Sequence, residues 1–144
     1  MIVVDSNVLL YAVGTDHRHR DASRRLFDAV AAGTLAATTT PEVIQEFTHV
    51  YGRRRPRSEA SRHARRFAAL LGPLVATTND VIVSALDLYE RHDRLDPFDA
   101  LLAAVARREG ASALVSADRA FVAVKRLPFV ELGSLEFDKL LDGR

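Results

Sequence analysis

The stretch Ile2-Val3-Val4-Asp5-Ser6-Asn7 decides how this chain is expected to fold. Three β-branched residues in a row are typical of a short strand that is buried on both faces of a parallel sheet. An aspartate directly after such a strand is unfavourable unless something charged meets it. Segment 113–118, Ala-Leu-Val-Ser-Ala-Asp, shows the same pattern of a short apolar strand followed closely by an acid.

The rest of the chain alternates between short apolar segments and longer amphipathic ones. Strands are expected at 2–4, 35–38, 74–76, 113–116 and 129–132. Helices are expected at 8–13, 19–32, about 41–51, about 58–71, 79–92 and about 97–108, with a further helix around 121–122. This alternation predicts an α/β fold: a three-layer α/β/α sandwich around a mostly parallel sheet of four to five strands, in a single domain over residues 1–144.

Composition excludes several other classes of protein. Hydrophobic residues make up 48% of the chain, which is enough for a packed core and too many for a disordered protein. No apolar run approaches the roughly 18 residues of a membrane span, and the opening MIVVDSNVLL lacks the basic region of a signal peptide. The absence of cysteine excludes disulfides, thiolate ligands and a thiol nucleophile. We therefore expect a cytoplasmic protein with no membrane partner.

The basic residues are almost all arginines, although the net charge is only +1. Of the 20 basic residues, only Lys125 and Lys139 are lysines. The planar donor fork of arginine suits phosphate groups, and the densest run is Arg-Arg-Arg-Pro-Arg at 53–57. A phosphate-contacting surface and an ordinary solvated helix end remain the two interpretations of this run.

Four acidic side chains fall where a parallel sheet collects its ligands. Asp5 and Asp118 follow strands, whereas Glu46 and Asp99 lie near the starts of predicted helices. Ligands of such sheets bind beyond the carboxyl ends of the strands, and the helices that follow the strands begin at that same edge. The sequence therefore predicts that the four carboxylates converge on one cleft.

A cluster of carboxylates needs a counter-charge, because unpaired carboxylates repel one another and resist desolvation. Hard cations such as Mg²⁺ or Mn²⁺ prefer oxygen ligands of this kind. One or two such ions can activate a water molecule and stabilise the transition state of a phosphodiester. The four acids therefore predict a Mg²⁺ or Mn²⁺ site that hydrolyses phosphodiesters.

Each acid also has a purely structural explanation. Asp96 is the natural N-cap of the helix after it, and Asp99, three residues on, can complete a capping box. Asp118 can cap the next helix, and Glu46 can be a solvated residue at the edge of an apolar stripe. Asp5 has the weakest alternative of this kind, because its strand is expected to be buried.

Four segments resemble the motifs of the PIN-domain family and occur in the order found there. They are 2–7 with Asp5, 41–47 with Glu46, 99–104 with Asp99, and 113–121 with Asp118. In the fourth segment a serine precedes the aspartate by two positions and a phenylalanine follows it by three. The resemblance covers residues 2 to about 131, and the chain length is similar to that of the compact VapC toxins of toxin–antitoxin pairs.

This resemblance implies a metal-dependent endoribonuclease of the toxin type. The catalytic residues and ligands of Mg²⁺ or Mn²⁺ would be Asp5, Glu46, Asp99 and Asp118. The polar groups that support them would be Ser6, Asn7 and Ser116. The implied partners are an RNA substrate, a cognate antitoxin that occupies the active site, and a second copy of the chain in a homodimer. Asp96 and Glu42 stay open as further members of the acidic cluster.

Three other features have more than one interpretation. The segment His-Arg-His-Arg at 17–20 can offer two histidines to a metal or form a solvated loop. Tyr11 and Tyr51 can stack on RNA bases or pack in the core. The arginine run at 53–57 can meet RNA, the antitoxin or a second subunit.

Three other functions start from similar features. Haloacid-dehalogenase-type phosphatases begin with a strand and Asp-x-Asp, but the second position here is Asn7, and no lysine lies near the cluster. A phosphorylated receiver domain would not carry its acceptor aspartate at the first strand. The remaining alternative is a PIN-fold protein that binds nucleic acid or regulates with weak or no nuclease activity, and the four intact acids speak against it.

Overall fold

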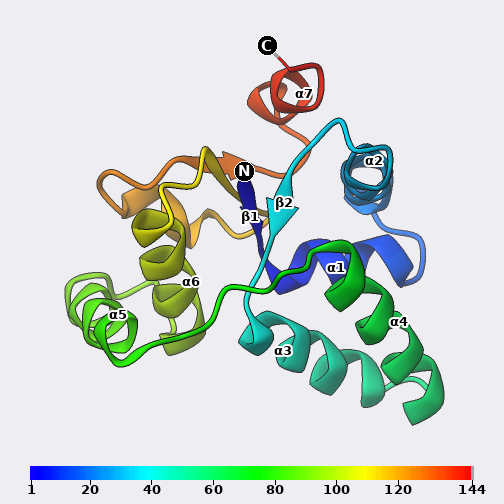
Figure 1. Ribbon diagram of the computed structural model, residues 1–144, viewed down its shortest axis with the longest axis horizontal. Coiled ribbons are helices and arrows are strands. Elements are labelled where there is room, and N and C mark those ends of the chain that lie inside the picture. The colour runs from blue at the N-terminus through cyan, green and yellow to red at the C-terminus, as the bar shows by residue number, and fades with distance from the viewer. Residues whose placement is uncertain (144) are drawn as a thin grey trace.

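The computed structural model describes residues 1–143 and shows a four-stranded parallel sheet enclosed by helices. The strands are β1 (Ile2–Val4), β2 (Ala37–Thr38), β3 (Ala113–Ser116) and β4 (Phe129–Glu131). The helices are α1 (Ser6–Val13), α2 (Arg20–Ala31), α3 (Pro41–Gly52), α4 (Arg57–Leu70), α5 (Asn79–Arg91), α6 (Pro97–Arg108), the 3-10 helix η1 (Arg119–Ala123) and α7 (Leu135–Leu141). Helices α5 and α6 lie on one side of the sheet and α1 and α2 on the other (Figure 1). The predicted α/β/α fold is confirmed.

Strand β1 lies inside the sheet and is buried on both faces. Its neighbours are β2 on one side and β3 on the other, with Val4 opposite Val115. All three residues of β1 are almost completely buried. This position explains why the strand is apolar at every residue instead of alternating.

The strand order β2-β1-β3-β4 creates a point where the chain changes direction across the sheet. From β1 the chain moves to β2 on one side, and after α3–α6 it returns to β3 on the other side. A crevice opens beyond the carboxyl ends of the strands at such a switch point. The residues after β1 and β3 therefore lie at the edge where an α/β sheet binds its ligands.

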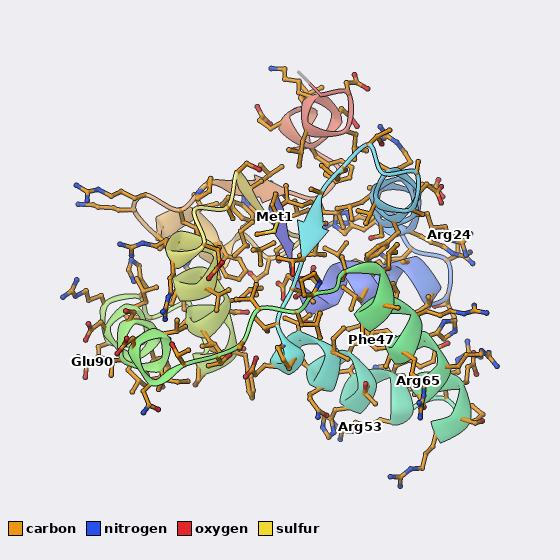
Figure 2. All side chains as sticks on the ribbon, viewed as in Figure 1. Met1, Arg24, Phe47, Arg53, Arg65 and Glu90 are labelled. Carbon is orange, nitrogen blue, oxygen red and sulfur yellow. The ribbon has the colours of Figure 1, made fainter. Side chains whose placement is uncertain are left out.

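Local sequence fixes the start of α3, one of the helices that begin at this edge. Thr40 caps α3 by accepting a hydrogen bond from the backbone N–H of Val43, at 3.3 Å, and Pro41 opens the helix. Farther along α3, Phe47 is fully buried, and its ring contacts those of Tyr51 and Phe67. In Figure 2 Phe47 lies among α1, α3 and α4, whereas Arg53 lies on the outer side of α3.

One expected strand is absent, and one helix is present that was not expected. Segment 74–76 is not a strand: the backbone N–H of Val75 donates one hydrogen bond to the Thr39 carbonyl, at 2.9 Å, and no ladder follows past the two-residue strand β2. The helix near 121–122 is the 3-10 helix η1. Helix α7 was not predicted; Ser134 caps it and the buried Phe137 anchors it.

Among the described residues, none of the helices has the length and apolar character needed to traverse a lipid bilayer.

Candidate active site

Asp5 is a buried carboxylate held by hydrogen bonds on both of its oxygens. Its side chain is 5% exposed and caps α1, because Oδ1 accepts from the backbone N–H of Ser6 at 2.7 Å. Oδ2 accepts from Ser116 Oγ at 2.6 Å and from Asn7 Nδ2 at 3.1 Å. Burial raises the pKa of Asp5, and the bonds from Ser116 and Ser6 oppose that rise.

Asn7 and Ser116 join the end of β1 to the end of β3. Asn7 Nδ2 donates to Ser116 Oγ at 2.9 Å, and Asn7 Oδ1 accepts from the backbone N–H of Ala117 at 3.2 Å. Ser116 Oγ also accepts from the backbone N–H of Asp118, at 2.9 Å. These bonds fix where the chain leaves each strand, and with it the position of Asp5 relative to Asp118.

Asp118 has a structural role and also contributes charge to the site. Its Oδ1 accepts from the backbone N–H of Ala120 at 2.9 Å, so the capping explanation holds for η1. Its negative charge also raises the pKa of Asp5 and of Asp99. Capping uses one carboxylate oxygen, which leaves the other free to face a ligand.

Asp99 lies in the first turn of α6, and its carboxylate is repelled by every other acid of the site. Its pKa is raised from 3.8 to about 7, first by burial and then by neighbouring negative charges. In decreasing order of effect, those charges belong to Asp5, Asp96, Asp118 and Glu46. Within residues 1–143, no hydrogen-bond donor offsets this repulsion at the Asp99 carboxylate. The structure therefore brings all four predicted acids to one place.

Glu46 on α3 is half-buried, and its pKa is also raised. Burial is the larger cause, followed by the charges of Asp5 and Asp96, while a hydrogen bond from Ser6 acts in the opposite direction. The rival residue Glu42 is not among the charges that perturb Asp99. Of the two glutamates on this helix, Glu46 is thus the one that joins the cluster.

Asp96 also belongs to the site, although the sequence left it open whether this residue joins the four predicted acids. Its Oδ1 accepts from the backbone N–H of Asp99 at 2.8 Å, which confirms its capping role. Its charge nevertheless raises the pKa of both Asp99 and Glu46. The spacing of three residues between Asp96 and Asp99 was the signal, since both then lie at the start of α6.

Thr39 was missed altogether. It is fully buried between β2 and α3, and its hydroxyl donates to the carbonyl of Val4 at 2.7 Å. This bond satisfies the last carbonyl of β1, directly before Asp5. The run of three threonines at 38–40 was the available signal, because hydroxyls at the end of a strand often bond to neighbouring backbone.

The donor chemistry of the cluster fits a hard divalent cation. Five carboxylates lie close enough to act on one another, and three of them (Asp5, Glu46 and Asp99) have pKa values raised partly by this repulsion, which a cation would relieve. As the side chains lie, no three acidic or histidine side chains in residues 1–143 converge on a single point as a complete metal-binding group. The fit therefore rests on the type and crowding of the donors.

The other predicted features have mixed outcomes. Of the two interpretations of Tyr51, packing in the core is the one that the structure shows. Its hydroxyl donates to Glu59 Oε1 at 2.8 Å. Tyr11 is only half-buried, and its ring stacks on that of His17 with the centroids 4.3 Å apart. The side chains of the arginine run at 53–57 are exposed.

Known proteins share both the sequence pattern and the fold. The PIN domain family model matches residues 2–127. Ribonuclease VapC7 from Mycobacterium tuberculosis is 47% identical over 125 residues, covering 84% of each chain.

Two solved structures share the fold. The crystal structure of VapBC2 from Rickettsia felis, bound to a DNA fragment from their promoter, has a TM-score of 0.72 at 17% identity and covers 91% of this chain and 98% of that one. The structure of Mycobacterium tuberculosis VapC20, a sarcin-ricin loop cleaving toxin, has a TM-score of 0.69 at 24% identity and covers 85% and 94%. The family match, the 47% identical relative and the shared fold agree, and the chain belongs to the PIN-domain family and, within it, to the VapC proteins.

Proposed function

We propose that this protein is a metal-dependent endoribonuclease that acts as the toxin of a VapBC-type toxin–antitoxin pair. The observation that carries the proposal is the crowding of carboxylates at the switch point, where the pKa of Asp99 is raised to about 7. The names of the relatives support it, since the 47% identical protein is named a ribonuclease. Retention of all four acids of the motifs argues against the alternative of a PIN-fold binding protein without activity.

The residues that would hold Mg²⁺ or Mn²⁺ are Asp5, Glu46, Asp99 and Asp118. When bound there, the ion would activate water and stabilise negative charge on the phosphate. Asp5 is the rigid member, because hydrogen bonds fix both of its oxygens. Glu46 comes from α3, Asp99 from α6 and Asp118 from the start of η1, so with Asp5 the site draws on four separate parts of the fold that must stay in register.

The proposed partners are RNA, a cognate antitoxin and a second copy of the chain. The VapBC2 structure is a toxin–antitoxin complex bound to DNA, which supports an antitoxin partner here. An apolar stripe on α5 supports the homodimer, since Ile82, Leu86 and Tyr89 recur on one face and are each at least 40% exposed. With RNA as the substrate and no cysteine in the chain, we propose that the protein acts in the cytoplasm.

Cleavage of total cellular RNA by the purified protein tests this function. The reactions contain Mg²⁺, Mn²⁺ or EDTA and compare the parent with Asp99→Asn and with Asp28→Asn, an exposed aspartate on α2. We expect discrete fragments that need the metal, disappear in Asp99→Asn and persist in Asp28→Asn. Cleavage that continues in EDTA would overturn the metal requirement. No cleavage with either metal would favour the binding-protein alternative.

A further inference from the structure

A cavity lies beside the acidic cluster, between the carboxyl-terminal ends of α1 and α3. Its volume is about 300 Å³, and the residues that line it include Tyr11 and His17 on one side and Val50, Tyr51, Arg54 and Arg55 on the other. A volume of this size suits one planar ring system with its substituents. The proposed function gives these residues no role.

One wall of the cavity is a flat aromatic surface. The rings of Tyr11 and His17 are stacked with 11° between their planes. His19 lies against the same pair, with its ring centroid 5.3 Å from that of Tyr11. His17 is exposed, so the stack is not closed off by the core. Stacked rings at a surface are the platform on which proteins bind unpaired nucleobases.

The part of the lining that follows α3 carries positive charge. Arg54 and Arg55 are both exposed, and Arg53 precedes them. None of the described residues that line the cavity is acidic. A lining that combines stacked rings with two guanidinium groups matches a nucleotide, whose base is flat and whose phosphate is anionic. An apolar peptide segment would leave these guanidinium groups without a matching charge.

The cavity is also close to the carboxylates along both helices. Tyr11 lies six residues after Asp5 on α1, which corresponds to about 9 Å along the helix axis. Val50 lies one turn beyond Glu46 on α3, or about 6 Å. Helices α1 and α3 pack against each other, so the two positions belong to one continuous surface. A strand whose phosphate reaches the acids would pass the cavity with an adjacent nucleotide.

We propose, building on the function above, that this cavity holds one base of a single-stranded segment of the RNA, next to the phosphate that is cut. The base stacks against the Tyr11–His17 pair, and Arg54 and Arg55 bind the adjoining phosphates. Because stacking accepts any base, the cavity selects unpaired RNA over duplex more than it selects a sequence. Specificity for loops would then begin at this cavity.

The chain provides its own optical probe for the test. It has three tyrosines and no tryptophan, and two of those tyrosines, Tyr11 and Tyr51, line the cavity. Tyrosine fluorescence is therefore followed while adenosine monophosphate is titrated into the protein in EDTA. Ribose 5-phosphate is the matched ligand, because it keeps the phosphate and lacks the base. The variants are His17→Ala and Arg55→Ala, with Arg107→Ala at the far end of α6 as the control.

We expect the nucleotide to bind about tenfold more tightly than ribose 5-phosphate. His17→Ala should weaken nucleotide binding about tenfold and leave ribose 5-phosphate unchanged. Arg55→Ala should weaken both ligands, and Arg107→Ala neither. Equal binding of the two ligands, or nucleotide binding unaffected by His17→Ala, would overturn the proposal and favour a protein segment as the occupant.

Cleavage kinetics separate this proposal from the function on which it rests. With metal present, His17→Ala should raise the KM for a short oligoadenylate about tenfold and leave kcat unchanged, because the base is held but does not react. A fall in kcat alone would contradict the proposal. The fluorescence titration needs neither metal nor turnover, so a parent protein that binds nucleotide but cuts no RNA would contradict the nuclease function and not the base site.

Discussion

The corner where β1 meets α1 and the first turn of α6 each present one aspartate to the same crevice, under opposite conditions. At the corner, Asp5 is almost fully buried but accepts hydrogen bonds from Ser6, Asn7 and Ser116. At the start of α6, Asp99 is less buried, but burial and then the charges of four other carboxylates raise its pKa to about 7. One acid is held in place by donors, and the other is left repelled by its neighbours.

This difference suggests a division of labour within the cluster. Donors to both oxygens keep Asp5 in one orientation and resist the effect of burial on its pKa. The repulsion at Asp99 is the part of the site that a divalent cation would relieve. Asp5 is thus expected to be the fixed point of the site and Asp99 the group most sensitive to metal and to pH.

The largest expected effect comes from removing the charge of the fixed acid. Asp5→Asn keeps the size of the side chain and removes a metal ligand, so RNA cleavage should fall by roughly a thousandfold or more. The unfolding temperature should fall modestly, because the amide nitrogen cannot accept the hydrogen bonds that one carboxylate oxygen accepts, while removal of a buried charge acts in the opposite direction. Cleavage at the parental rate would show that the fixed acid is not part of the reaction.

The next effect comes from removing a support instead of an acid. Ser116→Ala deletes the donor to Asp5 and the acceptor for Asn7 and for the Asp118 backbone. We expect a loss of about 1–3 kcal/mol in the free energy of unfolding and of about 10–100-fold in cleavage rate. Ser112→Ala, just before the opposite end of β3, is the matched control. Equal losses in both variants would mean that the hydroxyl does not position the site.

In the absence of metal, Asp99 should make the free energy of unfolding depend on pH. Its pKa is about 7 in the folded protein and near its ordinary value of 3.8 in the unfolded chain. The folded state therefore binds the proton more tightly, so the free energy of unfolding falls as the pH rises from about 4 to about 7.

Asp99→Asn should make this decline shallower, and the raised pKa values of Asp5 and Glu46 should account for what is left of it. Above about pH 7 in EDTA, the variant should be more stable than the parent by about 1–2 kcal/mol, a value reduced for the partial exposure of the group. Denaturant unfolding at about pH 5 and about pH 8 measures the difference. Added Mg²⁺ should reverse it by stabilising only the parent. Identical pH slopes for parent and variant would refute the repulsion at Asp99.

The smallest effect is expected from Asp96→Asn. Asparagine caps a helix about as well as aspartate, so α6 should keep its start while the site loses one negative charge. The pKa of Asp99 should move down toward its ordinary value, and cleavage should change by no more than about threefold. Titration of the Asp99 carboxyl by NMR provides the measurement. An unchanged pKa would show that Asp96 does not act on Asp99.

The sequence by itself determined the features that depend on residues close together in the chain. The apolar run before Asp5 fixed a buried strand, because three β-branched residues have no other favourable environment. The Thr40-Pro41 and Asp96-Pro97 pairs fixed the starts of α3 and α6, because capping depends on neighbours within one helical turn. The family motifs identified the acids for the same reason, since each motif is a short continuous segment.

Only the tertiary structure decided how those parts combine. The sequence could not show that Ser116 and Asn7, 109 positions apart, bind the same carboxylate, because that contact depends on β3 lying next to β1. It could not decide whether Glu42 joins Glu46 in the cluster, or show that Asp96 both caps a helix and adds charge to the site, because Coulomb interactions depend on distance in space. Segment 74–76 failed as a strand for the same physical reason: its apolar residues were suitable, but a strand exists only where a partner strand continues beside it.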